Sequence, residues 1–162
     1  MAPLDVAAVD FRRFEAADIE AVLRLHHVAL EAAAAHAGCG PWDDDLSTIE
    51  TVYIETGGEF LVGVLGSEIV AMGALRPVNP TVAELKRMRV TPELQGRGLG
   101  RRLLALLEET ATARGFTELE LDTADSMIAA RRLYDGAGYR EVRRALGPGS
   151  FELVFMRKRL AQ

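Results

Sequence analysis

Cysteine is almost absent from this chain, since Cys39 is the only one among 162 residues. An internal disulfide is therefore excluded, and the reducing cytoplasm is the expected compartment. No apolar run approaches the roughly 18 residues that cross a membrane, so we expect no transmembrane segment. The first residues also lack a basic stretch followed by an apolar core, which argues against a secretory signal.

An excess of positive charge is absent as well. The sequence has 19 Lys and Arg against 24 Asp and Glu, a formal net charge of −5, which disfavours a nucleic-acid-binding surface. Apolar residues make up 49% and charged residues 27%, as is typical of globular proteins. The sequence contains no internal repeat and no low-complexity linker. We therefore expect a single domain over residues 1–162, long enough to bury a sizeable core.

Apolar periodicity predicts strands that alternate with helices. The expected strands are 9–14, 59–65, 68–76, 81–90, 117–123, 139–142 and 151–158. The expected helices are 16–35, 46–54, 126–136 and one that begins at Leu99 and is stopped by Gly115. A tight turn at Gly66 joins the second and third strands. The acidic run from Asp43 to Asp45 is placed to cap the helix 46–54.

The most informative stretch is Gln-Gly-Arg-Gly-Leu-Gly at residues 95–100, between a strand-like run and a predicted helix. Its three glycines leave backbone N–H groups uncovered, and the helix adds its positive dipole end, so the turn suits a phosphate or pyrophosphate. No Lys-Ser or Lys-Thr pair follows, as a P-loop requires. A dinucleotide fingerprint counted from Gly96 needs a sixth-position glycine, where this chain has Arg101. A plain glycine-rich turn is the remaining alternative.

The surrounding residues favour one family. The strand 84–90 followed by this loop resembles the central signature of the GNAT superfamily of N-acetyltransferases, Gln/Arg-x-x-Gly-x-Gly/Ala, which Gln95, Gly98 and Gly100 fill. Residues 130–139, which include Leu133 and Tyr134, are similar to the family's Ala-x-x-Leu-Tyr-x-x-x-Gly-Phe block. The resemblance implies an α/β (α+β) fold. Its single mixed, mostly antiparallel sheet has about six to seven strands and is flanked by about four helices.

The same resemblance implies that the chain binds acetyl-CoA. Backbone N–H groups of the loop would hold the pyrophosphate, and the strand before it would pair with the pantetheine arm through main-chain hydrogen bonds. Arg97, Arg101 and Arg102 either add charge near the phosphates or face solvent. The implied coenzyme-binding residues are Met88, Arg89, Val90, Gln95, Gly96, Arg97, Gly98, Leu99, Gly100 and Arg101.

Two residues are candidates for catalysis. In the family, the tyrosine equivalent to Tyr134 lies near the coenzyme sulfur and assists the departing thiolate; the alternative is an ordinary half-buried helix tyrosine. Glu84 occupies a position where some members place a base that works through water, although a solvated strand-end glutamate fits equally well. His26 lies on an apolar helix stripe and is expected to line the core or a cleft. The histidines and Cys39 lack metal-ligand spacing, so we expect no metal.

We therefore expect an acetyl-CoA-dependent N-acetyltransferase that acts on a primary amine of a small molecule or peptide. The acceptor is expected to bind near Trp42 and the first two helices, where the acidic run from Asp43 to Asp45 either attracts a cation or caps a helix. The resemblance also admits a homodimer. The alternative of a different class is a domain of the same fold that binds an acyl-CoA as a sensor or structural module without turnover. A Rossmann-type nucleotide binder is a distant third.

Overall fold

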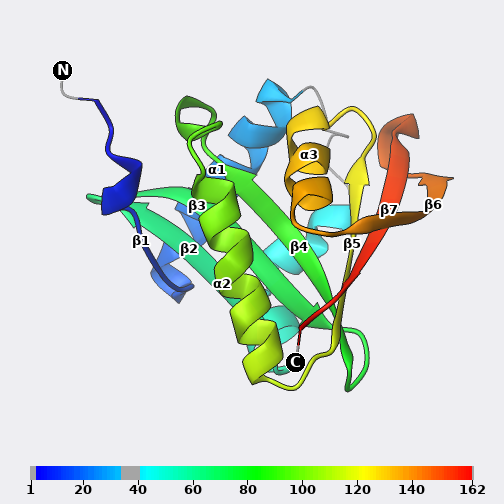
Figure 1. Cartoon of the computed structure of the whole chain (residues 1–162). Helices are drawn as coiled ribbons and strands as arrows, with labels where there is room; N and C mark the ends of the chain where they lie inside the picture. The colour runs from blue at the N-terminus through cyan, green and yellow to red at the C-terminus, as the bar shows by residue number, and fades with distance from the viewer. Residues whose placement is uncertain (1–2, 34–40, 162) are drawn as a thin grey trace.

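A computed structural model describes residues 3–33 and 41–161, and it contains one seven-stranded sheet in the order β1-β2-β3-β4-β5-β7-β6 (Figure 1). Only β4 and β5 pair in parallel, so the sheet is mixed and mostly antiparallel. The predicted fold is confirmed. The strands are β1 (Asp10–Arg13), β2 (Glu59–Leu65), β3 (Glu68–Pro77), β4 (Val82–Val90), β5 (Glu118–Ala124), β6 (Arg140–Leu146) and β7 (Glu152–Arg159).

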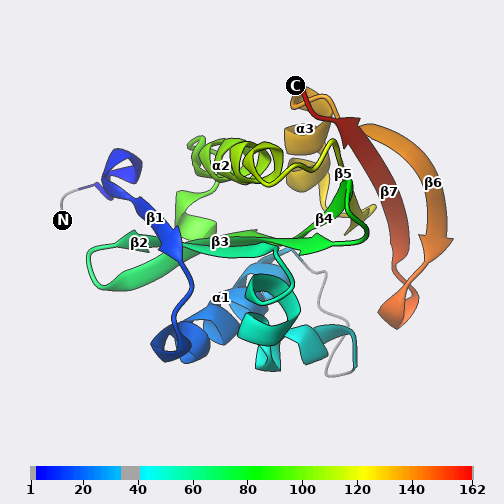
Figure 2. The same ribbon diagram turned by 90° about the horizontal axis from the view of Figure 1, so that it is seen from below.

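Helices cover both faces of the sheet (Figure 2). The helix α1 (Ile19–Ala32) lies on one face, where Val22 and Leu25 are buried in a core that includes Phe60 and Met72. The helices α2 (Leu99–Ala113) and α3 (Ile128–Gly136) lie on the other, around a second core that includes Leu103. Each such buried side chain contributes roughly 1.5–3 kcal/mol, so the sheet is held firmly between the two layers.

The predicted helix 46–54 is wrong as a regular α-helix. The structure has a 3₁₀ helix, η3 (Pro41–Ser47), followed by a short π-helix, η4 (Glu50–Ile54). The physical reason is that Asp43 and Asp45 do not serve as caps. Both carboxylates bind the guanidinium of Arg87 on β4, which fixes the path of the chain into η4.

The strand β6 is longer than predicted. It reaches Leu146, whereas the apolar pattern ends near Val142. It lies at the edge of the sheet and pairs only with β7, so most of its side chains are exposed and no inward-facing alternation marks its full length.

The feature that matters most for function is a divergence between β4 and β5. The two strands pair only from Val82 with Glu118 to Glu84 with Glu120, whereas β5 stays paired with β7 as far as Ala124. Beyond Glu84, β4 carries an extra residue relative to β3, and Arg87 has a positive φ of 59°. This bulge bends β4 away from β5. Within residues 3–33 and 41–161, one backbone edge of β4 beyond Glu84 therefore has no strand partner.

Candidate active site

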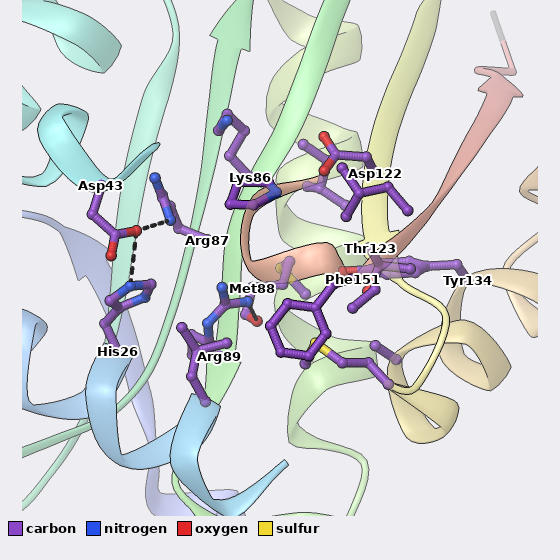
Figure 3. A pocket seen from close by; sticks show the side chains of 17 residues that line it. His26, Asp43, Lys86, Arg87, Met88, Arg89, Asp122, Thr123, Tyr134 and Phe151 are labelled. Carbon is purple, nitrogen blue, oxygen red and sulfur yellow. Dashed lines mark hydrogen bonds and ion pairs between the residues drawn. The ribbon is translucent and has the colours of Figure 1, made fainter. Parts of the chain in front are cut away.

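A cavity of about 240 Å³ lies where β4 and β5 diverge. Its lining comes from α1, η3, β4, β5, α3 and the segment between β6 and β7, so elements from across the chain meet there. In Figure 3, Asp43 lies between His26 and Arg87 on one side of the cavity, and Tyr134 lies on the other. The cavity therefore has a charged wall and a wall that carries a tyrosine.

The glycine loop leads from β4 into α2. Gly96 and Gly98 have φ values of 75° and 84°, which residues with side chains rarely adopt. The six backbone N–H groups from Gly96 to Arg101 donate no hydrogen bond within residues 3–33 and 41–161. They gather at the positive end of the α2 dipole, which is the arrangement that binds a phosphate group.

Gln95 and Gly100 shape the two ends of this loop. The Gln95 side-chain amide donates a hydrogen bond to the Val90 carbonyl oxygen over 3.0 Å, which joins the loop to the end of β4. A Cβ at Gly100 would make only ordinary contacts, at 3.4 Å from Leu133 Cδ2 and 3.9 Å from Val90 Cγ2. The fold therefore tolerates a side chain at position 100, and a glycine there leaves the backbone open to a ligand.

Tyr134 projects from α3 and is only 5% exposed. Its ring packs edge-to-face against Tyr139 at 5.7 Å between centroids, and its hydroxyl has no hydrogen-bond partner among the residues described. Burial raises the pKa of Tyr134 to about 12. The hydroxyl is thus protonated at neutral pH and is available as a donor toward the cavity.

Glu84 does not line this cavity. Its carboxylate pairs with Arg76 at 2.6 Å and lies 3.6 Å from the Lys86 ammonium, and the residue lines a neighbouring hollow. The neighbouring carboxylate is Asp122 of β5, which lines both the hollow and the main cavity. Asp122 is exposed to solvent where it borders the two hollows, and it has no hydrogen bond or ion pair in the described part of the chain. Partial loss of solvent around the carboxyl raises its pKa.

Arg87 is the centre of a buried ion-pair cluster. Its Nη1 donates to Asp43 Oδ1 over 3.0 Å and its Nε donates to Asp45 Oδ2 over 2.9 Å. The Tyr53 hydroxyl also donates to Asp45, and His26 Nε2 lies 3.1 Å from Asp43 Oδ1. The cluster joins α1, η3, η4 and β4, so it braces the charged wall of the cavity.

These charges set the protonation states of the wall. Burial alone would raise the pKa of the Asp45 carboxyl, but hydrogen bonds and charge from Arg87 outweigh it and lower that pKa. Burial, reinforced by the charge of Arg89, lowers the pKa of His26 to about 4, so the imidazole is neutral at pH 7. Burial and the charge of Arg87 lower the pKa of Arg89 to about 10, and its guanidinium remains charged.

The comparisons with known proteins agree with this geometry. Residues 27–139 match the Acetyltransferase (GNAT) family. The chain is 28% identical over 141 residues to the uncharacterized N-acetyltransferase YjgM of Escherichia coli (strain K12), across 84% of each protein. It is 33% identical over 100 residues to the N-acetylaspartate synthetase of Xenopus tropicalis, across 60% of this chain and 37% of that protein. Its fold matches yncA from Salmonella typhimurium, solved with acetyl-CoA, at a TM-score of 0.77 and 22% identity over 95% of each chain.

This protein belongs to the GNAT family. It is an acyltransferase of the N-acetyltransferase type, and the resemblance seen in its sequence is confirmed. In this acetyltransferase Met88 and Arg89 line the cavity, whereas Val90 lies just beyond it and packs against the core under α2. Leu99 is buried in the same core. Its backbone N–H still belongs to the open loop.

The arginines of the acetyltransferase loop differ in their surroundings. The Arg97 guanidinium donates to the Leu4 carbonyl oxygen over 3.0 Å, and Arg102 donates to the carbonyls of Val6 and Val9. Arg101 is exposed on the first turn of α2. Arg102 is therefore engaged with the N-terminal segment.

Other sequence expectations concern parts of the chain with less structural detail. Cys39 and His36, like the end of the predicted helix 16–35, lie outside the described residues, as does the side chain of Trp42. In residues 3–33 and 41–161 no three His, Cys, Asp or Glu side chains gather in a way that would hold a metal ion. Nor does this part of the acetyltransferase contain a helix long and apolar enough to cross a bilayer.

Sequence reasoning missed Asp122 and the ion-pair partners of Arg87. Asp122 has a signal in the sequence, because Glu118, Glu120 and Asp122 alternate along β5 and so share one face. In the structure both glutamates pair with Arg157, at 3.2 and 2.8 Å, whereas Asp122 forms no ion pair with any described residue. The Arg87 cluster has no such signal, since it joins residues more than 40 positions apart.

Proposed function

We propose that this acetyltransferase moves an acetyl group from acetyl-CoA directly to a primary amine of a small molecule or peptide, within a ternary complex and as a single domain. The observation that carries the proposal is an edge of β4 and six loop N–H groups that find no partner among the described residues, together with the Tyr134 hydroxyl. The bound acetyl-CoA of the Salmonella structure supports the donor. The name of the Xenopus relative supports an acceptor that is a small molecule.

The loop residues from Gly96 to Arg101 would bind the pyrophosphate of the donor through their N–H groups, and the free edge of β4 at Met88 and Arg89 would pair with the pantetheine amides. Replacing Gly100 with alanine tests the first role, because a Cβ there costs the fold little but obstructs an anion held on the backbone. We expect the KM for acetyl-CoA to rise about tenfold, the loss of roughly one good charge-assisted hydrogen bond.

Gly136→Ala on α3 is the matched control, since a Cβ there meets no atom of the described residues within 4 Å and is equally compatible with the fold. Thermal unfolding of both variants should equal or exceed that of the parent, because alanine favours a helix over glycine. If Gly100→Ala keeps its fold and its KM for acetyl-CoA is unchanged, the coenzyme does not bind to this loop.

In the transfer step the amine nitrogen forms a bond to the acetyl carbon while the carbon–sulfur bond breaks. The electron pair of that bond leaves with the sulfur, and the amine proton goes to a base. Tyr134 would donate a hydrogen bond to the departing sulfur. A thiol has an ordinary pKa of about 8.5, well below that of the buried Tyr134, so complete proton transfer from the phenol is uphill by roughly 5 kcal/mol. We infer that Tyr134 stabilises the thiolate as a hydrogen-bond donor.

Two carboxylates are candidates for the base, and they are distinguishable. Glu84 remains the candidate from the sequence, acting through water, although Arg76 pairs with it. The geometry adds Asp122, which lines the cavity and carries no ion pair in the described residues. We expect Asp122→Asn to lower kcat by roughly 10²-fold and to abolish the acidic limb of the pH–rate profile. If Glu84→Gln instead lowers kcat and abolishes the acidic limb while Asp122→Asn stays active, Glu84 is the base.

Thiol release from acetyl-CoA with a panel of primary amines tests the activity itself. Tyr134→Phe should lower kcat by roughly 10²-fold with little change in the KM for acetyl-CoA, because the lost hydrogen bond forms as the sulfur departs. Tight binding of acetyl-CoA without turnover on any amine would leave only the non-catalytic binding module.

The proposal extends to assembly and location. The edge strand β6 exposes Val142 and Leu146, the latter 81% exposed, and a homodimer would cover them; light scattering at micromolar concentration tests this. We propose a location in the cytoplasm, which the single cysteine in the sequence supports.

A further inference from the structure

Three cationic side chains of β4 face the cavity, and two of them are matched by carboxylates. Arg87 is bound by Asp43 and Asp45. Lys86 lies 3.6 Å from Glu84. Arg89 has no carboxylate within ion-pair distance in the described part of the chain.

The hydrogen-bond donors of Arg89 are also largely unused. A guanidinium carries five N–H donors. Nη1 of Arg89 donates to the Met88 carbonyl oxygen over 2.8 Å, and Nε is buried with no acceptor among the residues that the structure describes. The residue is nevertheless partly exposed and lines the cavity. A half-buried charge with unused N–H donors is unfavourable unless the anionic group of a ligand binds it.

A second unpartnered charge lies across the cavity. Asp122 of β5 is exposed at the cavity and has no ion pair within residues 3–33 and 41–161, whereas Arg89 comes from β4. The two therefore lie on opposite sides of the divergence between these strands. Among the described residues, the cavity presents a cation and an anion that no ion pair of the protein neutralises. That pattern complements a small zwitterion whose ammonium group faces Asp122 and whose carboxylate faces Arg89.

We propose that the acceptor is a free amino acid and that Arg89 binds its carboxylate. This inference rests on the proposed N-acetyltransferase function and names the substrate class of that site. The planar guanidinium matches a carboxylate with two parallel hydrogen bonds. A peptide amine offers no carboxylate next to its amino group, and a simple alkylamine offers none at all, so both leave Arg89 unsatisfied.

The test compares free amino acids with their own carboxamides and with the amines that lack the carboxyl group. The readout is kcat/KM for thiol release at saturating acetyl-CoA. We expect the parent to favour the amino acid by about ten- to a hundredfold, as for a charged hydrogen bond that is lost. The amine of a carboxamide is less basic and more often free of its proton, so intrinsic reactivity runs against this preference.

Arg89→Met should abolish the preference, so that kcat/KM for each amino acid falls to the value for its own carboxamide in the same variant. Arg89→Lys should retain part of the preference, because lysine keeps the positive charge but lacks the planar pair of N–H donors. Arg24→Met is the matched control: it removes an exposed arginine from α1 and should leave the preference unchanged.

The alternatives give different results. Equal use of amino acids and carboxamides by the parent overturns the inference and leaves the acetyltransferase proposal standing. A uniform fall in kcat for every amine in Arg89→Met also overturns it, because Arg89 would then act on the acetyl group. If no amine is acetylated, calorimetric titration of amino acids and carboxamides into the complex with coenzyme A tests the inference by binding alone. Carboxylate-dependent binding that Arg89→Met abolishes upholds the inference, and its absence refutes it.

Discussion

Replacing Arg87 with methionine is expected to be among the most destabilising single changes in this acetyltransferase. The side chain is 8% exposed and holds Asp43 and Asp45, whose side chains are 20% and 10% exposed. Methionine fills a similar volume, so the change removes the charge and the hydrogen bonds with little change in packing. Two carboxylates then remain half-buried without their cation.

The magnitude follows from breaking a buried ion pair on one side only, which costs roughly 3–5 kcal/mol because the remaining charge is uncompensated. In a chain of this length such a loss lowers Tm by roughly 6–20 °C. Differential scanning calorimetry at pH 7 and urea unfolding of parent and variant measure it. Asp45→Asn added to Arg87→Met should recover at least about 1 kcal/mol, because it removes one of the orphaned charges.

The pH dependence gives an independent readout. Arg87 lowers the pKa of Asp45 in the folded parent, so its contribution is present above the ordinary pKa of 3.8 and is lost as the pH falls below it. In Arg87→Met the orphaned carboxyl gains a proton more readily when folded, so the deficit against the parent should shrink as the pH falls toward 3. A deficit below 1 kcal/mol at neutral pH, unaffected by Asp45→Asn, would refute this account.

Three further changes have defined outcomes. The pKa of His26 is about 4 in the folded chain against an ordinary 6.5, so the unfolded chain binds more protons between these two pH values. The free energy of unfolding should therefore fall by at most about 3 kcal/mol as the pH drops from 6.5 to 4. His26→Gln should flatten this pH dependence, measured by urea unfolding. Gly58→Ala should cost about 3 kcal/mol in the same assay, because a Cβ would overlap the backbone carbonyl oxygen of Leu75. Arg89→Met should raise the free energy of unfolding by about 1–3 kcal/mol, since it removes an uncompensated half-buried charge; a loss of stability would show that the fold itself needs this charge.

Local signals sufficed for most of the fold. The turn at Gly66 joins β2 and β3 as predicted, and the strand, glycine loop and helix around residues 82–113 follow the sequence pattern closely. These elements are specified by alternation, helical spacing and glycine, all of which act over a few residues. The loop and Tyr134 were also identifiable, because each lies within a short motif.

The charged wall was beyond sequence reasoning because it depends on tertiary contacts. The acidic run from Asp43 to Asp45 carries the pattern of a helix cap, and only the approach of Arg87 in space reassigns Asp43 and Asp45 to an ion-pair cluster. The bulge at Arg87 is equally hidden, since arginine gives no local indication of a positive φ.

The bulge explains why the cavity is charged. Without it, alternation along β4 would send Lys86 and Arg87 to opposite faces. In the structure Ala83 and Leu85 face the core under α2, and so do Met88 and Val90, which means that the alternation changes phase between them. The one extra residue therefore turns Lys86, Arg87 and Arg89 toward the same wall. Within the described residues carboxylates bind the first two and none binds Arg89, which is why we assign Arg89 to a ligand.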